Sequence, residues 1–462
     1  MNIGIILDNP KREIDGVLLL TYQLARQGHD VYIIPMYQQG HDVPLLKLDG
    51  IIVNYARLNN KSFLRAYKEL GITVFVLDSE GGVIAEKDIP TPSNPSLMRN
   101  TGVQEYIDHY LFWGKTQRDA FARAGMLPDD RLHVTGCPRY DLCSTRWRSL
   151  LEYPRRDYIL VNTNFSTINP LFTGTAKSEM DVFHSAGWDA GYVRDLFADL
   201  HGVFRKYLDT VAELAARNQD RMFVVRPHPF ENPAVYERTY AAHRNVIVDG
   251  TGSVFNVIHH ATCVLHLNCQ TAVETILLDK LPVSMEFLNT GLLLRHWSLP
   301  SEISYCANSP EELDAIVKDP EKYRTQYPLV QIHERYIQPW FHINDGNASM
   351  RVADVVRAHT NPARGAGWLR RLAMSLAGCL EQPRLLQRAQ SLLMSLVGSR
   401  AVSNLRRRLN AARRTKYIEC EFVESGVNRI ARHDGADISF QATHARGLGT
   451  GLPLATLRVT AA

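Results

Sequence analysis

The chain of 462 residues contains no long hydrophobic run, although 45% of its residues are hydrophobic. Its apolar stretches, such as residues 17–20, are much shorter than the roughly 20 residues that a transmembrane helix needs. Its first residues show neither the basic segment nor the long apolar core of a signal peptide. We therefore expect a cytoplasmic protein with no membrane-spanning helix.

Cysteine is scarce and scattered, and the seven cysteines include no Cys-x-x-Cys pair. This usage argues against a disulfide framework and against a zinc site. The chain also lacks a Gly-x-Gly-x-x-Gly sequence after its first apolar run, a Gly-x-x-x-x-Gly-Lys-Ser/Thr loop and a His-Glu-x-x-His pair. We therefore expect no dinucleotide, no ATP hydrolysis, no metal and no other cofactor.

Acidic residues are almost absent from one segment. Residues 361–416 hold twelve Lys and Arg but one acid, Glu381, which leaves a charge of about −7 on the rest of a chain whose net charge is +4. A mildly acidic body disfavours nucleic-acid binding. The basic segment reads as short amphipathic helices, and these fit an anionic membrane surface, a solvated basic face, or a helical pair packed on the body.

Short apolar runs alternate with helical patterns over the first 350 residues, in two series that meet near residue 150. Such alternation predicts an α/β fold with two Rossmann-like, doubly wound domains facing a cleft. We place the domains at 1–150 and 151–340, a helix that crosses back to the first domain at 341–360, and a basic helical extension at 361–462. The end of this extension, from about Glu424, has weak periodicity and is expected to be poorly ordered.

Ligands of such folds bind beyond the carboxyl ends of the strands, so polar residues there are candidates. The run 224–229 ends an apolar strand in Arg226-Pro-His228-Pro. Proline restricts its own backbone and that of the preceding residue, so a stiff loop presents Arg226 and His228. A cation and an imidazole suit a phosphate; the alternative is a proline-rich turn with solvated side chains.

A second strand end reads His266-Leu-Asn268-Cys-Gln270-Thr271-Ala-Val-Glu274. Backbone N–H groups at a helix start near Thr271, together with its hydroxyl, predict an anion site that Asn268 and Gln270 flank. Glu274 then reaches a ribose hydroxyl. Thr271-x-x-Glu274 is equally a capping box, and both interpretations stay open.

The first series also ends its strands in polar residues. Asp78-Ser-Glu80-Gly-Gly follows one strand, and a carboxylate there can act as the general base toward an acceptor hydroxyl, with Glu80 or Asp78 as the base. The alternative is a polar turn that Asp78 caps. The acceptor-side candidates after the first strand are Asp8, Asn9, Lys11 and Arg12, of which Asp8 and Asn9 also suit a turn or helix cap.

These motifs, in this order, resemble bacterial surface carbohydrate biosynthesis proteins. The resemblance covers about residues 1–360 and includes the runs 8–12, 35–39, 54–57, 77–82, 113–114, 135–141, 162–165, 226–229 and 345–349. The His228-Pro229 pair with the later Thr271 turn is similar to GT-B transferases that use cytidine nucleotides. These are capsule sialyltransferases, 3-deoxy-manno-octulosonic acid (Kdo) transferases of lipopolysaccharide, and glycerophosphate polymerases. Sialyltransferases of this kind carry an acid-acid-glycine motif, in which serine replaces the first acid here.

The resemblance implies a metal-independent glycosyltransferase that moves a sugar from a nucleotide donor, CMP-linked as for Kdo or a sialic-acid-like sugar, to a glycan or lipid-linked glycan acceptor. The donor lies on domain 151–340, where Arg226, His228 and Thr271 stabilise the leaving phosphate, and domain 1–150 supplies the base. Beyond the reach of the resemblance, the charge of the segment 361–416 predicts peripheral contact with the inner face of the cytoplasmic membrane as one of its three interpretations. The alternatives are a sugar-nucleotide epimerase and a non-catalytic assembly protein of a polysaccharide complex.

Overall fold

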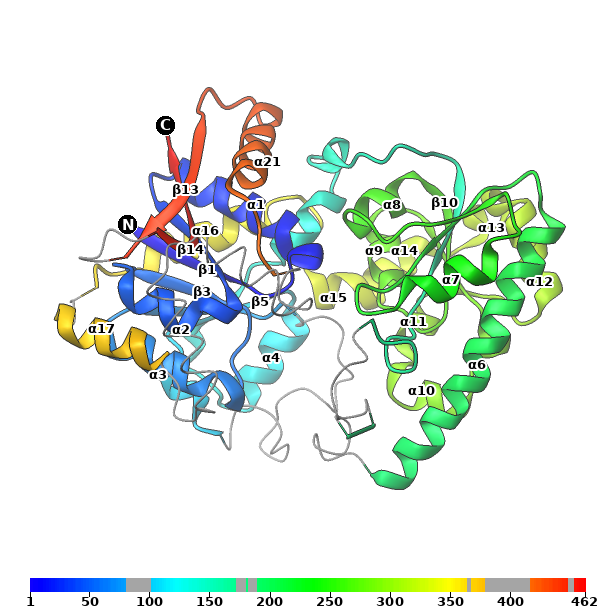
Figure 1. The fold of residues 1–462 in the computed structure, drawn as a ribbon, viewed down its shortest axis with the longest axis horizontal. Coiled ribbons are helices and arrows are strands. Elements are labelled where there is room, and N and C mark those ends of the chain that lie inside the picture. Colours follow the sequence, from blue (N-terminus) through cyan, green and yellow to red (C-terminus); the bar gives the residue numbers. More distant parts are fainter. Residues whose placement is uncertain (80–100, 172–179, 182–188, 364–366, 379–415, 448–452) are drawn as a thin grey trace. The chain divides into compact units, whose positions relative to one another are not determined.

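A computed structural model of the chain describes residues 1–79, 101–171, 180–181, 189–363, 367–378, 416–447 and 453–462. The chain divides into two compact units (Figure 1). Unit 1 comprises Met1–Leu150 with Gln338–Ala462, and unit 2 comprises Leu151–Ile337. Each unit has its own sheet and its own hydrophobic core.

The sheet of unit 1 has the order β13-β14-β2-β1-β3-β4-β5-β6. β1 pairs in parallel with both β2 and β3, so the strand order reverses at β1. Strands β1 to β6 are buried and apolar, and they are all parallel, as their continuous hydrophobic runs predict. The strands are β1 (Asn2–Leu7), β2 (Asp30–Pro35), β3 (Gly50–Val53), β4 (Thr73–Leu77), β5 (His109–Phe112), β6 (Leu132–Val134), β13 (Phe440–Arg446) and β14 (Pro453–Ala461).

Helices of unit 1 pack on this sheet and on one another. α1 begins at Pro10, where the fixed φ of proline suits a helix start, and it contacts both α16 and α21. α3 packs against β4, and α4 packs against β5 and β6. The helices are α1 (Pro10–Arg26), α2 (Gln39–Asp42), α3 (Lys61–Glu69), α4 (Lys115–Arg123), α15 (Gln338–Phe341), α16 (Ala348–His359), α17 (Trp368–Ala377) and α21 (Cys420–His433).

Unit 2 has a six-stranded parallel sheet of order β12-β11-β10-β7-β8-β9. Its strands are β7 (Tyr158–Asn162), β8 (Phe223–Arg226), β9 (Val246–Val248), β10 (Ala261–His266), β11 (Leu281–Ser284) and β12 (Tyr305–Cys306). Its helices are α6 (Ala190–Arg217), α7 (Pro233–Tyr240), α8 (Val254–His260), α9 (Thr271–Leu277), α10 (Gly291–Trp297), α11 (Leu299–Glu302), α12 (Pro310–Lys318), α13 (Pro320–Gln326) and α14 (Leu329–Ile332). The order reverses at β7, between β8 and β10.

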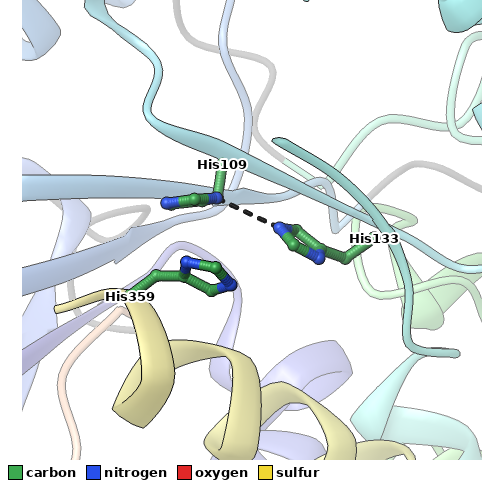
Figure 2. A group of neighbouring side chains, drawn as sticks. All are labelled: His109, His133 and His359. Atoms are coloured by element: carbon green, nitrogen blue, oxygen red, sulfur yellow. Dashed lines mark hydrogen bonds between the residues drawn. The ribbon is translucent and has the colours of Figure 1, made fainter. Parts of the chain in front are cut away.

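Three histidines gather at the amino-end edge of the unit 1 sheet (Figure 2). His109 is the first residue of β5, His133 lies in β6, and His359 ends α16. Their ring centroids are 4.3 to 5.2 Å apart. The cluster therefore links two strands to the last turn of a helix that follows more than 220 residues later in the chain.

The carboxyl-terminal segment is folded onto unit 1, and our expectation of a poorly ordered tail from Glu424 is wrong for the residues described. β14 pairs antiparallel with β2, through Leu457–Val459 and Val31–Ile33, and β13 pairs with β14. The apolar side chains of this hairpin alternate, which buries Phe440, Ala442 and Val459. The hairpin thus extends the parallel sheet at its β2 edge.

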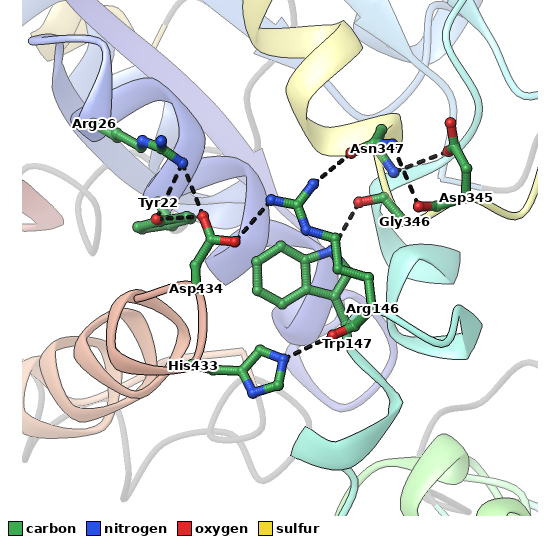
Figure 3. A network of polar contacts seen from close by, with 9 residues as sticks. All are labelled: Tyr22, Arg26, Arg146, Trp147, Asp345, Gly346, Asn347, His433 and Asp434. Carbon is green, nitrogen blue, oxygen red and sulfur yellow. Dashed lines mark hydrogen bonds and ion pairs between the residues drawn. The ribbon is translucent and has the colours of Figure 1, made fainter. Parts of the chain in front are cut away.

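A polar network holds α21 in place (Figure 3). Just after α21, Asp434 accepts hydrogen bonds from Tyr22 (2.7 Å) and Arg26 (2.8 Å) of α1 and from Arg146 (2.7 Å). Arg146 also donates to Asn347 (2.5 Å), the residue before α16. Burial opposes ionisation of Asp434, but the hydrogen bonds from Arg146 and Tyr22 outweigh it and lower the pKa of this carboxyl.

A buried carboxylate caps α16. Asp141, in the 3₁₀ turn η8 (Pro138–Cys143), accepts hydrogen bonds from the backbone N–H groups of Ala348 (2.8 Å) and Ser349 (2.7 Å). These are two of the N–H groups that a helix start leaves without an intrahelical partner. Burial raises the pKa of Asp141 to about 6, although the N–H bonds oppose the rise. Two sequence motifs, 135–141 and 345–349, therefore form one structural joint.

Of the basic segment 361–416, the structure describes residues 361–363, residues 367–378 with α17, and residue 416. Arg371 of α17 is buried and donates to the carbonyl oxygens of Leu46 (2.8 Å) and Pro44 (3.4 Å), so the helix is anchored on unit 1. Trp368 and Leu369 are exposed. Within the described ranges, no helix is both long and apolar enough to cross a bilayer.

Candidate functional site

The carboxyl ends of three neighbouring strands meet in unit 2. β10, β7 and β8 are adjacent and parallel, and each ends in one of the polar runs that the sequence predicted. This edge lies where the strand order reverses, which is the usual place for ligands in doubly wound sheets. Hydrogen bonds join the three loops. Thr163 donates from its backbone N–H to the Arg226 carbonyl (3.2 Å), and Asn164 donates to the Asn268 carbonyl (3.1 Å).

Arg226 ends β8 and is 7% exposed. Its two terminal nitrogens donate to the carbonyl oxygens of Thr251 and Gly252, both at 2.6 Å. Burial lowers the pKa of this guanidinium, and nearby Asp249 opposes that effect. Arg226 therefore uses two of its five N–H donors to hold the loop that follows β9. Its direct contact with a phosphate stays a prediction.

His228 stands half-buried in the loop after β8. Its Nδ1 accepts a hydrogen bond from the Phe230 backbone (3.3 Å), and its own backbone N–H donates to the Thr163 hydroxyl (3.2 Å). An accepting Nδ1 fixes the neutral tautomer that carries its proton on Nε2. The loop therefore holds an imidazole whose Nε2 is a hydrogen-bond donor.

Glu231 lies just after His228 in this loop and is 2% exposed. Its carboxylate accepts from the Thr163 hydroxyl (2.5 Å), the Tyr236 hydroxyl (2.5 Å) and the Phe165 backbone N–H. Burial raises the pKa of this carboxyl, and the hydrogen bonds limit the rise. Because Thr163 also receives the His228 N–H, one buried acid fixes both the loop after β7 and the Pro-His-Pro turn.

Thr271 joins the third strand end to the first. Its hydroxyl accepts a hydrogen bond from Asn162 at the end of β7 (3.0 Å) and donates to the Cys269 sulfur (3.1 Å). Asn268 has a left-handed backbone (φ 47°) and exchanges hydrogen bonds with Asn289, which fixes the turn. The structure therefore brings Thr271, Asn162 and the Arg226–His228 loop to one edge.

The capping-box interpretation of Thr271 and Glu274 is wrong. α9 begins at Thr271, so the exposed Gln270 is the N-cap residue, and no side chain caps the helix. Thr271 is one residue too late in the helix to receive the N–H group that a cap needs. Glu274 is buried in α9, and its contact with a ribose stays a prediction.

The corresponding edge of unit 1 carries charged side chains. Arg12 donates to Glu13 (2.7 Å) and to Ser79 (3.4 Å), and Glu13 also accepts the Asp8 backbone N–H (3.0 Å). Asp8 is bound by Lys416 (2.8 Å). Asn9 is the N-cap residue of α1 without a side-chain cap bond, and Lys11 is exposed.

Asp78 also belongs to the unit 1 edge. It lies 3.6 Å from Arg57 and forms a hydrogen bond with the buried Tyr110, whose pKa is raised chiefly by burial. A small pocket of unit 1 is lined by Asp78, Ser79, Asn54 and Glu13, among others. Glu80, the other base candidate, lies outside the described residues. Asp78 therefore lines a pocket together with Ser79 and Glu13, which both accept hydrogen bonds from Arg12, and its role as a base stays a prediction.

Sequence reasoning missed the acids that organise both edges. Glu231 stands five residues after Arg226, and Glu13 lies one turn into α1, but acidic residues are usually exposed and neither position belongs to a motif. Asn162 and Thr163 lie in a polar run that follows a predicted strand, but neither is among the predicted phosphate-binding residues. The signal that could have found Glu231 is its place two residues after the Pro-His-Pro turn, close to the end of a buried strand.

No family model matches the chain, and neither does any curated protein sequence. Solved structures do match. Staphylococcus aureus MnaA with UDP is 12% identical with a TM-score of 0.50, covering 79% of this chain and 100% of MnaA. The Neisseria meningitidis UDP-GlcNAc 2-epimerase bound to UDP-GlcNAc is 12% identical (TM-score 0.47, covering 78% and 100%). The wall teichoic acid polymerase TagF is 11% identical (0.48, 77% and 88%).

At these identities the likeness shows the fold alone. The MnaA match and the two parallel sheets confirm the predicted fold class, a GT-B-like α/β protein with two Rossmann-like units.

Proposed function

We propose that this protein is a glycosyltransferase of bacterial surface polysaccharide biosynthesis that binds a nucleotide-activated sugar at the carboxyl-end edge of unit 2. The observation that carries the proposal is the hydrogen-bonded joint of His228, Thr163 and Glu231, next to Thr271. The buried Glu231 carboxylate fixes the loop that carries the His228 imidazole, whose Nε2 is a hydrogen-bond donor. Such a fixed donor needs little reorganisation when negative charge develops on a leaving phosphate.

The donor nucleotide is proposed to be CMP-linked, as for Kdo or a sialic-acid-like sugar. His228 donates to the phosphate through Nε2, and Thr271 lines the same edge. Arg226 places the loop after β9 and adds positive charge behind the site. Support comes from the resemblance of the His228-Pro229 turn to cytidine-nucleotide transferases, together with the geometry of the turn.

The acceptor is proposed to bind unit 1, with Asp78 or Glu80 as the general base. Asp78 is held by Arg57 and Tyr110 at the end of β4, next to a pocket. A carboxylate in that place can take the proton of an acceptor hydroxyl. Asp8, Asn9, Lys11 and Arg12 are the proposed acceptor contacts from the end of β1.

Peripheral contact with an anionic membrane is proposed through the basic segment. α17 is anchored by Arg371 and leaves Trp368 and Leu369 exposed beside the exposed Arg370. An exposed indole beside an exposed guanidinium, which also pairs with Glu69 (3.0 Å), suits the lipid headgroup region, where a lipid-linked glycan acceptor lies. Co-sedimentation with phosphatidylglycerol vesicles should fall after Trp368→Ser with Leu369→Ser, and unchanged sedimentation would contradict this contact.

The test is nucleotide binding by the full chain, measured by titration calorimetry with CMP, CDP, UDP and GDP. We expect selective binding of a cytidine nucleotide, and a loss of at least about tenfold in affinity in His228→Ala. The matched control is His201→Ala, which removes an exposed imidazole from α6 of the same unit. A control with unchanged affinity shows that the loss belongs to the site.

The other outcomes separate the competing functions. Preference for UDP would overturn the cytidine donor and favour a UDP-sugar epimerase or UDP-sugar transferase. No binding of any nucleotide by folded protein would overturn the transferase and favour a non-catalytic assembly protein.

A further inference from the structure

The histidine cluster of unit 1 lies at the edge of the sheet opposite to the proposed acceptor contacts. His109 opens β5, whereas Asp8 and Asp78 follow the carboxyl ends of β1 and β4. Leu111 of β5 pairs with His133 of β6, so His109 and His133 project from the same face of the sheet, because residues two apart share a face. The end of α16 brings His359 to that face (Figure 2).

The nitrogen atoms converge. His109 Nδ1 and His133 Nε2 are 3.0 Å apart, and one nitrogen from each of the three rings lies within 4.8 Å of the others. Zinc binds imidazole nitrogen at about 2.0–2.1 Å, which places two tetrahedral ligands about 3.4 Å apart. The rings therefore need to move by roughly an ångström to share one ion.

The neighbouring acid does not account for the cluster. Asp108 precedes His109, but its carboxylate is bound by Lys68 (2.6 and 2.7 Å) and by the Val74 backbone N–H (2.8 Å). Within the part of the chain that the structure describes, His359 makes ring contacts in the cluster but no side-chain hydrogen bond. One hydrogen bond between two rings and a third ring in contact with both thus place three imidazole nitrogens within 4.8 Å of one another.

The hydrogen bond between His109 and His133 accounts for one proton of the cluster when no metal ion is bound. Within the apo pair one nitrogen carries the shared proton. When an ion takes its place, that proton moves to the other nitrogen of the same ring, and no net proton is lost.

The absence of metal-binding sequence motifs predicts no metal, but the placement of the three rings differs from that expectation, and we propose that His109, His133 and His359 bind one zinc ion through three imidazole nitrogens. A hollow beside the cluster is lined by His109, His359, Asn361 and Asp108, and also by Lys68, which pairs with Asp108. The ion joins β5 and β6 to the carboxyl-terminal end of α16, where the helix dipole also favours positive charge. The site stabilises unit 1 and is separate from the proposed phosphate site.

The test is Co²⁺ titration of the full chain after dialysis against EDTA, followed by visible absorption, since tetrahedral cobalt gives an intense visible band. We expect one equivalent with that spectrum, which zinc then displaces. His133→Gln and His359→Gln should each weaken binding by about tenfold or more, because each removes one of three ligands. His201→Gln, an exposed residue of unit 2, is the control and should bind as the wild type does.

Thermal unfolding supplies a second readout. Zinc should raise the Tm of the wild type and of His201→Gln, but not that of His359→Gln, because an ion stabilises the state that binds it. His359 ends a helix and is half-buried, so its replacement should fold even where His133→Gln does not. No tetrahedral spectrum in the wild type, or one that persists in the folded variants, would overturn the site.

Discussion

The carboxyl-end edges of the two units are built from different interactions. In unit 2, hydrogen bonds from two hydroxyls and a backbone N–H converge on one buried carboxylate, Glu231. In unit 1, the edge is held by ion pairs, such as Arg12 with Glu13 and Lys416 with Asp8. Both edges lie where the strand order of the sheet reverses.

The difference matches the chemistry proposed for each unit. A phosphate is bound well by hydrogen-bond donors that are held in place. In unit 2 the buried Glu231 fixes the loop that carries the His228 imidazole, and it does so without adding a charge at the protein surface. An acceptor hydroxyl needs a carboxylate, which must be balanced by nearby cations when no substrate is present. Buried hydrogen-bond networks are also costly to break, whereas partly exposed ion pairs are worth little.

The largest expected effect is that of Glu231→Ala. Three donors lose their buried partner, so the free energy of unfolding should fall by about 3 kcal/mol or more. Urea unfolding followed by circular dichroism measures this change. Glu231→Gln retains a hydrogen-bond acceptor and should lose less stability. Glu237→Ala changes an exposed residue of α7 and should be about as stable as the wild type. A loss in Glu231→Ala no greater than in Glu237→Ala would contradict the bracing role.

Asp141→Ala should cost about 2 kcal/mol, because two N–H groups at the start of α16 lose a buried cap. Thermal and urea unfolding measure the loss. Asp437→Ala removes an exposed acid of the same unit and should be neutral. If both variants unfold alike, α16 is not capped by Asp141.

Thr271→Val should weaken nucleotide binding by about tenfold without unfolding the protein, because valine keeps the shape but removes the hydroxyl that accepts from Asn162. Calorimetry with the preferred nucleotide measures the affinity. Thr271→Ser keeps the hydroxyl and is the matched control. If Thr271→Val and Thr271→Ser bind the nucleotide equally well, the Thr271 hydroxyl has no role in nucleotide binding.

The smallest expected effect is on the pH dependence of the free energy of unfolding. The contributions of Asp434 in unit 1 and Glu231 in unit 2 have opposite signs. The pKa of Asp434 is lowered on folding, so its stabilisation of about 1 kcal/mol is present above its unfolded pKa, about 3.8, and is lost as the pH falls below that. The pKa of Glu231 is raised, so folded protein holds its proton more tightly, and stability from this group falls as the pH rises above about 4.5.

Unfolding measured between pH 3 and pH 7 tests these signs. Asp434→Asn should lose stability at pH 7 but approach the wild type at pH 3. Glu231→Gln should lose least relative to the wild type at the upper end of that range. Parallel pH profiles for the wild type and both variants would refute the contrast.

The sequence predicted the parallel core because its strands are continuous apolar runs, which are recognisable without any knowledge of their partners. It also located the polar turns at Arg226–His228 and Asn268–Thr271, since they directly follow such runs. It did not predict the β13–β14 hairpin, whose small residues give a weak pattern and whose partner strand, β2, is more than 400 residues away.

Long-range contacts explain the remaining failures. The role of Glu231 depends on Thr163, 68 residues earlier, and Asp434 pairs with Tyr22, 412 residues earlier. Neither spacing leaves a local signature. One further error has a local cause: α9 begins at Thr271 itself, with Gln270 as the N-cap residue, and sequence patterns do not define the first residue of a helix to that accuracy.

The most direct test of the central claim is a crystal structure of the protein with CDP. The account predicts a phosphate at the carboxyl-end edge of unit 2, within hydrogen-bond distance of His228 Nε2 and beside Thr271. A phosphate bound elsewhere, with the His228 loop empty, would contradict the account.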